Sequence, residues 1–329
     1  MFLASAAALA AANATDFPRL LSFAIRGGAS LGAYEAGLNW GGIGILSGLS
    51  QRDMALGGRL RSFEAASFAG TSAGSINALM SGLVWCARPE SEGGFPNRID
   101  DNLFRGVWTS IDVNELLPPR ADSPTYSADD ALLSRKSLHD AAELLRRHWR
   151  MPAFRAGCRA PIGASVTRVV PDVLRVEDVD VQNQRFYIPF ELRVAGDGRA
   201  GFFFDPADYP TLVDPAMILL PRARDAPAGS VSDERVIDAL FASSAVPLGF
   251  GRRRLSYCRL KPGVIVGDVP AAAAAAAPAV REPLLCPPGY ELTEAEFADG
   301  GLFDNLPIGL ARLLAESNLR AAANPLPVL

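Results

Sequence analysis

The apolar and polar positions of the first 90 residues fall into two similar units. Each unit contains a short apolar run that predicts a buried strand, a glycine-containing turn, and a longer apolar segment that predicts a helix. The predicted strands cover 20–25 and 65–69, and the predicted helices cover 32–49 and 75–86. Strand, turn and helix, repeated in this order, predict a parallel α/β sheet with helices on its faces.

The chain changes character between residues 90 and 151, where Pro, Gly, Asp and Arg become frequent. This stretch predicts an insertion over the sheet, with one amphipathic helix over 137–150. Its aromatic residues either form the core of this cap or line an apolar cleft or an interface. They are Phe95, Phe104, Trp108 and Trp149.

The later elements are predicted from shorter patterns. In chain order they are strands over 162–170, 186–194 and 216–220, a helix over 232–242, a strand over 296–298 and a helix over 306–315. Asp304 or Asn305 is the expected N-cap of the last helix.

These elements predict one domain over residues 20–315, with the insertion at 90–151 and a Pro- and Ala-rich excursion at about 258–290. A tail at 316–329 follows. Within residues 1–15, the apolar or small run at 2–12 has the length of a signal-peptide core and 12–14 resemble an Ala-x-Ala cleavage site, but no Lys or Arg precedes the core. They are either a signal peptide, which places the protein in the periplasm, in the envelope or outside the cell, or a disordered or helical tail. In the second case the protein is cytoplasmic or peripherally membrane-associated.

The composition is that of an ordinary globular protein, with 49% hydrophobic and 21% charged residues among 329. Thirty-two basic against 36 acidic residues give a net charge of −4 without long basic blocks, which argues against a nucleic-acid partner. No apolar run reaches the roughly 18–20 residues that cross a bilayer. Any membrane contact is therefore expected to be peripheral.

The four cysteines contain no C-x-x-C pair, and we expect no metal site and no cofactor. Cys258 and Cys286 flank the excursion. They form a disulfide if the chain is exported, or are two half-buried cysteines if it is not.

The sequence Gly70-Thr71-Ser72-Ala73-Gly74 matches G-x-S-x-G, the motif of a nucleophile on a sharp strand-to-helix turn. The glycines are needed two residues to either side because the strained backbone packs closely there. Ser72 is then exposed at a helix N-terminus, whose dipole stabilises developing negative charge.

Only two histidines occur, His139 and His148, and both lie on the helix predicted over 137–150. This count excludes multi-histidine metal sites. It also excludes the Ser, Asp, His order of an α/β-hydrolase, because no histidine follows His148. We expect both to be surface or packing residues, so another group must accept the proton of Ser72.

The candidate base is Asp299, which follows the strand predicted over 296–298 and precedes Gly300 and Gly301. Two glycines let the backbone bring a carboxylate close to a serine at little steric cost. Burial in an apolar cleft raises a carboxyl pKa above its usual value of about 4. From the residues alone, an ordinary Asp-Gly turn is the alternative.

A third motif, Arg26-Gly27-Gly28-Ala29-Ser30-Leu31-Gly32, lies between the first predicted strand and helix. Its backbone N–H groups suit an oxyanion or a phosphate. It is neither a dinucleotide fingerprint nor a P-loop, because it has G-G-x-x-x-G spacing and lacks Gly-Lys-Ser/Thr.

The three motifs, in this order, resemble the patatin-like phospholipase family over about residues 20–315, and the stretches 30–37 and 242–247 are also similar to it. The resemblance implies a three-layer α/β/α fold with a central, mostly parallel sheet and a helical or irregular insertion. It also implies a lipid acyl hydrolase or carboxylesterase, acting on phospholipid or another lipid ester.

For the site, the resemblance implies a dyad in which Ser72 is the nucleophile and Asp299 the base. The backbone N–H groups of Gly27, Gly28 and Ala29 would form the oxyanion hole. Acyl transfer would pass through an acyl-serine intermediate.

Two positions depart from the family. Ala29 replaces its usual third glycine, and Leu31 replaces its usual Lys or Arg. Arg26 either reaches the site in compensation or faces solvent. These departures leave two alternatives: a non-catalytic lipid-binding or regulatory protein of the same fold, or a serine thioesterase or peptidase with the same dyad.

Overall fold

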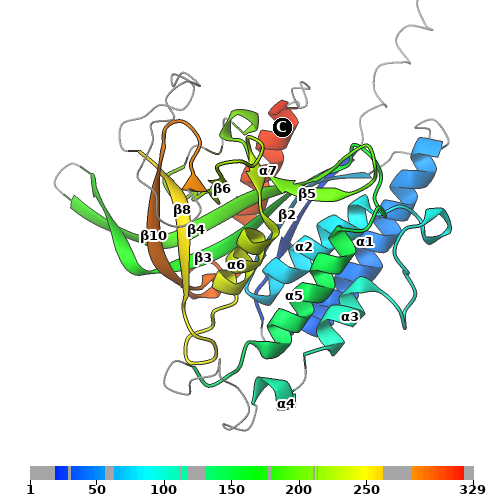
Figure 1. Cartoon of the computed structure of the whole chain (residues 1–329), viewed down its shortest axis with the longest axis horizontal. Helices are drawn as coiled ribbons and strands as arrows, with labels where there is room; N and C mark the ends of the chain where they lie inside the picture. The colour runs from blue at the N-terminus through cyan, green and yellow to red at the C-terminus, as the bar shows by residue number, and fades with distance from the viewer. Residues whose placement is uncertain are drawn as a thin grey trace, which may run out of the picture.

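A mixed eight-stranded sheet forms the centre of the computed structural model (Figure 1). The structure describes residues 19–28, 31–55, 63–111, 113–117, 131–176, 179–209, 212, 214–261 and 284–321. Its strands are β1 (Arg19–Ile25), β2 (Phe63–Thr71), β3 (Arg159–Val176), β4 (Val179–Val194), β5 (Ala200–Phe203), β6 (Arg222–Ala223), β7 (Ser230–Val231), β8 (Arg253–Leu260), β9 (Leu284–Leu285) and β10 (Tyr290–Asp299). Its α-helices are α1 (Gly32–Ala55), α2 (Ala73–Cys86), α3 (Leu103–Thr109), α4 (Val113–Leu116), α5 (Lys136–Trp149), α6 (Asp233–Ser243) and α7 (Ile308–Ala321). Short 3₁₀ helices are η1 (Glu90–Glu92), η2 (Pro206–Asp208) and η3 (Gly300–Leu302).

The parallel part of the sheet is β1–β2–β3, and β1 and β2 are the strands of the two predicted strand–turn–helix units. On the other edge of β3 the sheet continues through β4, β5 and β7, and all of these pairs are antiparallel. β10 is antiparallel to both β3 and β8. The pair β6–β9 forms a separate two-stranded ribbon.

Helices cover both faces of the sheet (Figure 1). On one face, Gly82 of α2 packs against Ile162 of β3. The next residue of β3, Gly163, points to the opposite face and packs against Leu310 and Leu314 of α7. Helices α1 and α6 contact α2 and lie on its side. The predicted three-layer α/β/α fold is therefore confirmed.

Two local predictions are wrong. Residues 216–220 form no strand, because Met217 and Leu219 make single bridges, one to β4 and one to β8. An apolar run signals burial, and here the buried segment crosses between strands instead of pairing along one. The last helix begins at Ile308 and is not capped by Asp304 or Asn305, whose backbone groups bond to the Gly-rich loop, the nucleophile turn and η3.

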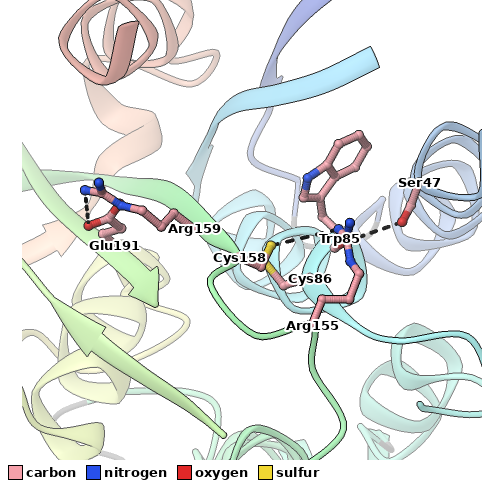
Figure 2. The surroundings of a disulfide bond; sticks show 7 residues. All are labelled: Ser47, Trp85, Cys86, Arg155, Cys158, Arg159 and Glu191. Carbon is pink, nitrogen blue, oxygen red and sulfur yellow. Dashed lines mark hydrogen bonds and ion pairs between the residues drawn. A yellow bond between two sulfur atoms is a disulfide. The ribbon is translucent and has the colours of Figure 1, made fainter. Parts of the chain in front are cut away.

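The insertion leaves and rejoins the core at one place, where the disulfide Cys86–Cys158 joins the end of α2 to the start of β3 (Figure 2). Arg155 stabilises this junction, the base of the insertion: its backbone N–H donates to the Cys86 carbonyl at 2.9 Å and its guanidinium donates to the carbonyl of Trp85. Above the base lie η1, α3, α4 and α5. The insertion is thus a helical cap closed by a cross-link.

The aromatic residues of the insertion form the core of the cap. Phe95, Phe104 and Trp149 are at most 5% exposed, and Trp108 is partly buried. Of the two alternatives that the sequence left open, the structure therefore supports packing.

A second disulfide joins Cys258 on β8 to Cys286 after β9, which is the pairing expected for an exported chain. The alanine run that it encloses lies outside the described residues. Among the residues that are described, none of the helices is both long and apolar enough to cross a membrane.

Candidate active site

Strands β2 and β10 end facing each other along the same edge of β3. Thr71, the last residue of β2, is opposite Ser165, whereas Asp299, the last residue of β10, is opposite Val166. Because β2 runs parallel and β10 antiparallel to β3, their C-terminal ends meet there. This topology brings Ser72 and Asp299 together from opposite ends of the chain.

Ser72 lies on a strained turn between β2 and α2 and is only 4% exposed, so the expectation of an exposed serine is wrong; neighbouring loops, including the Gly-rich loop, cover it. Its φ is 55° and its ψ is −129°, a left-handed conformation that favours glycine. A Cβ on Gly70 would collide with the backbone of Gly74, and a Cβ on Gly74 would collide with the carbonyls of Ile25 and Arg26. Both glycines of the motif are thus required by backbone packing, and the second fixes α2 against the end of β1.

Gly74→Ala should destabilise the protein by about 1–3 kcal/mol, because the added methyl group forces β1 and α2 apart. Gly37→Ala is the matched control, since this helical glycine of α1 is exposed and a methyl group added there would meet open space. It should stabilise by about 0.5–1 kcal/mol. Urea unfolding of both variants measures the free energy of unfolding, and changes of the same sign in the two variants would contradict the prediction.

The carboxyl group of Asp299 is buried, with 5% of the residue exposed. Its Oδ1 accepts a hydrogen bond from the N–H of Gly301 at 2.7 Å, and its Oδ2 has no hydrogen-bond partner among the described residues. Burial raises the pKa of Asp299 above its ordinary value, although the Ser72 hydroxyl and the Gly301 N–H act in the opposite direction. One oxygen is thus held in place and the other is free to accept a proton.

The Ser72 hydroxyl faces this carboxyl group closely enough to influence its pKa, but without an ordinary hydrogen bond. Such contacts between nucleophile and base often tighten only when substrate binds. Neither histidine takes part: His139 packs edge-on against Phe241, and the Nδ1 of His148 bonds the carbonyl of Leu144.

Ser243, at the end of α6, fixes the backbone of the nucleophile. The N–H of Ser72 donates to its Oγ at 3.0 Å, and that hydroxyl donates to the carbonyl of Ser165 on β3 at 2.7 Å. The sequence offered a partial signal, since Ser243 lies in the stretch 242–247 that resembles the family. Its role depends on a contact across 171 residues, which no local pattern contains.

The Gly-rich loop lies against the nucleophile turn, because a Cβ on Gly27 would lie 3.1 Å from the Cβ of Ser72. The N–H of Gly27 donates to the carbonyl of Asn305 at 2.9 Å, so this predicted oxyanion donor is already engaged. Gly28 follows, and Ala29 lies outside the described residues. Arg26 is exposed, and its charge lowers the pKa of Glu35, which burial raises.

Asn77 ties the start of α1 to the cap. Its Nδ2 donates to the carbonyl of Gly32 at 3.1 Å, and its Oδ1 accepts from Nε1 of Trp108 at 2.8 Å. Asn77 is fully buried within α2, so the Gly-rich loop, the nucleophile helix and the insertion share one polar contact.

A cavity of about 520 Å³ adjoins Asp299. Two of its lining residues adjoin the backbone of Asp299, since Ala298 precedes it and the carbonyl of Ala245 accepts its N–H, whereas Ser72 and Asp299 are not among the lining residues. Most of the wall is apolar and includes Val169, Leu248, Phe250, Leu302 and Phe303. Its size and lining are those of a small-molecule site.

The described residues contain no group of three or more His, Cys, Asp or Glu side chains placed to hold a metal ion. The reactive groups that the structure places at this site are a serine hydroxyl, a buried carboxylate and backbone N–H groups.

The sequence profile of the family described as patatin-like phospholipase matches residues 23–312, a span that includes all three motifs. No curated protein and no solved structure matches the chain. The matched span covers most of the 329 residues and contains the sheet except for the first four residues of β1, together with the strained serine turn and the buried aspartate. The chain belongs to the patatin-like phospholipase family.

Proposed function

We propose that this protein is a lipid acyl hydrolase that cleaves carboxylic ester bonds through a Ser72–Asp299 dyad. Family membership supports lipid acyl hydrolysis in general. The observation that carries the dyad is the meeting of β2 and β10 on β3, which brings a strained serine to a buried carboxylate with one unpartnered oxygen.

In the first half of the reaction, Oγ of Ser72 attacks the carbonyl carbon of the ester while its proton passes to Oδ2 of Asp299. The tetrahedral intermediate then collapses, the bond to the leaving alcohol breaks, and the alcohol oxygen takes the proton from Asp299. In the second half, water gives a proton to Asp299 and attacks the acyl-serine. The fatty acid leaves as Ser72 recovers that proton.

The oxyanion of each tetrahedral intermediate needs N–H donors. We assign this role to Gly28 and Ala29 of the Gly-rich loop, with Gly27 holding the loop in place through Asn305. The N–H of Ala73 is a further donor, because the first residue of a helix has no intrahelical acceptor and directly follows the nucleophile.

The apolar cavity beside Asp299 supports an acyl chain as the group that the site holds. The test is hydrolysis of a panel of phospholipids, neutral lipids, soluble short-chain esters, thioesters and peptides. We expect turnover of the lipid esters and fluorophosphonate labelling of Ser72. Labelling with preferred turnover of thioesters or peptides would favour the hydrolase alternatives, and an unlabelled Ser72 would favour the non-catalytic alternative that Ala29 and Leu31 suggest.

Peripheral contact with a lipid surface is part of the proposal. Six apolar side chains that are 44% to 81% exposed belong to segments at or near the three motifs and the cavity: Leu31, Leu248, Leu302, Phe303, Leu306 and Ile308. Leu31 belongs to the Gly-rich motif, Leu248, Leu302 and Phe303 line the cavity beside Asp299, and Leu306 and Ile308 follow within nine residues of Asp299. We call these six residues the rim. Exposed apolar groups gathered around a site are typical of surfaces that meet a membrane or a partner.

Ile308→Glu should lower hydrolysis of phospholipid vesicles several-fold and leave hydrolysis of a soluble ester unchanged. The variant should fold, since an acidic residue is favourable at the N-terminus of α7. The matched control is Val170→Glu on β3, which changes a similarly exposed apolar residue outside this rim. Equal vesicle activity in the two variants would argue against contact through the rim.

We also propose export to an oxidising compartment. Two disulfides, each closing an excursion of the chain, support it, because such bonds persist outside reducing cytosol. Mass spectrometry of the native protein under non-reducing conditions should find both pairs, and free thiols at all four cysteines would contradict the proposal.

A further inference from the structure

Residues Asp304 and Asn305 contact all three motifs of the candidate site. The carbonyl of Asn305 accepts the N–H of Gly27 from the Gly-rich loop at 2.9 Å. The carbonyl of Asp304 accepts a hydrogen bond from the hydroxyl group of Thr71, in the nucleophile turn, at 2.8 Å. The N–H of Asp304 donates to the carbonyl of Gly300, next to Asp299, at 2.9 Å.

The side chain of Asn305 lies between two of these motifs. Its Oδ1 occupies the space where a Cβ on Gly27 would lie, and a Cβ on Gly301 would be 2.9 Å from the same atom. A side chain at Gly27 or Gly301 would therefore require the Asn305 amide to move. A Cβ on Gly27 would also meet Ser72, so this junction lies next to the nucleophile.

Tyr187 on β4 anchors this segment to the sheet. Its hydroxyl donates to Oδ2 of Asp304 at 2.6 Å, and the tyrosine is only 5% exposed. Burial and Asp304 both raise the pKa of Tyr187, so the hydroxyl remains a donor throughout the neutral range. Tyr187 thus fixes Asp304 relative to the central strand β4, and the hydrogen bond from Thr71 to the Asp304 carbonyl ties the nucleophile turn to the same strand.

We infer that Asp304 and Asn305, anchored by Tyr187, are positioning residues that hold the Gly-rich loop and the nucleophile turn in register around Asp299. The inference rests on the proposed esterase function for its kinetic consequence, but not for its structural one. Engaging the N–H of Gly27 fixes the orientation of the next peptide, which carries the N–H of Gly28. Without the segment, the oxyanion loop and Ser72 lose their common support, and small misplacements of this kind lower rates strongly.

The test uses two variants that remove one hydroxyl each, Tyr187→Phe and Thr71→Val. Both should raise hydrogen–deuterium exchange at Gly27 and lower the rate of fluorophosphonate labelling of Ser72 by roughly 10- to 100-fold. For ester hydrolysis, kcat should fall while KM stays within about twofold, since no substrate contact is removed. Thr71→Ser keeps the donor and should restore both exchange and labelling.

The matched control is Tyr290→Phe, a change of the same kind at a buried tyrosine on the far end of β10. It should leave exchange at Gly27 and labelling of Ser72 as in the wild type. Exchange at Gly27 that stays at the control level in Tyr187→Phe and Thr71→Val would overturn the inference whatever the activities are. Raised exchange with unchanged labelling would overturn the positioning role. A wild type that is neither labelled nor active would refute the proposed function, and exchange would still decide whether the segment holds the loop.

Discussion

Ser72→Ala should abolish ester hydrolysis and fluorophosphonate labelling while the protein stays folded. The loss should be on the order of 10⁵-fold in kcat, because no acyl-enzyme can form without the serine oxygen. Alanine fits the site sterically, since it only removes Oγ from a residue whose backbone N–H is held by Ser243. The measurement is single-turnover hydrolysis of a chromogenic ester, with circular dichroism as the check on folding.

Ser72→Gly is the control that separates catalysis from backbone strain. It should be as inactive as the alanine variant, but more stable by about 1–3 kcal/mol, because glycine adopts φ 55° and ψ −129° without strain and alanine does not. Hydrolysis that survives in either variant would exclude Ser72 as the nucleophile. Equal stability of the two variants would show that the turn is not strained in solution.

The parts of the fold that could be predicted from sequence are those with a local signal. The first two strand–turn–helix units follow from apolar runs and glycines, and the structure has both, with β2 two residues longer at each end than predicted. Strand β8 is absent from the predicted elements because it begins within the run Arg252-Arg253-Arg254, and a run of charges is typical of a solvated face. Residues 216–220 are wrongly predicted as a strand because an apolar run does not reveal whether a buried segment pairs.

In the candidate site too, the residues within short motifs could be predicted from the sequence, whereas the contacts that support them could not. Ser72, Asp299 and the glycines around them lie in short motifs, and their order along the chain carries the resemblance to the family. The supporting contacts of Ser243, Asp304 and Asn77 join residues 31 to 233 positions apart. Such contacts depend on how β2, β3 and β10 meet, which no window of sequence contains. For the same reason, the engagement of Gly27 by Asn305 is visible only in the structure.

Asp299→Asn should remove activity and stabilise the protein at neutral pH. The rate should fall by roughly 10²- to 10⁴-fold, because asparagine cannot accept the proton of Ser72. The amide keeps the shape of the carboxyl group, and its oxygen can still accept the Gly301 N–H. Burial is the main cause of the raised pKa of Asp299, so ionisation is less favourable in the folded protein than in the unfolded chain.

The sign of the stability effect follows from that direction. A carboxyl group whose folded-state pKa is raised contributes stability below its unfolded pKa of about 4, and this contribution is lost as pH rises through the folded-state pKa. At pH 7 the unfolded wild type therefore gains more from ionising Asp299 than the folded protein does, and the asparagine variant has no such ionisation. The variant should melt higher at pH 7, by about 2–4 °C for each kcal/mol, and the difference should vanish below about pH 4.

The same ionisation governs the rate of the wild type. Its kcat/KM should fall as pH drops through the raised pKa of Asp299, so the acid limb should lie above about pH 4, where an exposed aspartate titrates. A variant that is inactive but less stable than wild type at pH 7 would mean that the carboxylate has favourable partners beyond those in this structure. Because a base gains strength from the same burial that destabilises its charge, higher stability and lost activity in one substitution would identify Asp299 as the base more firmly than lost activity alone.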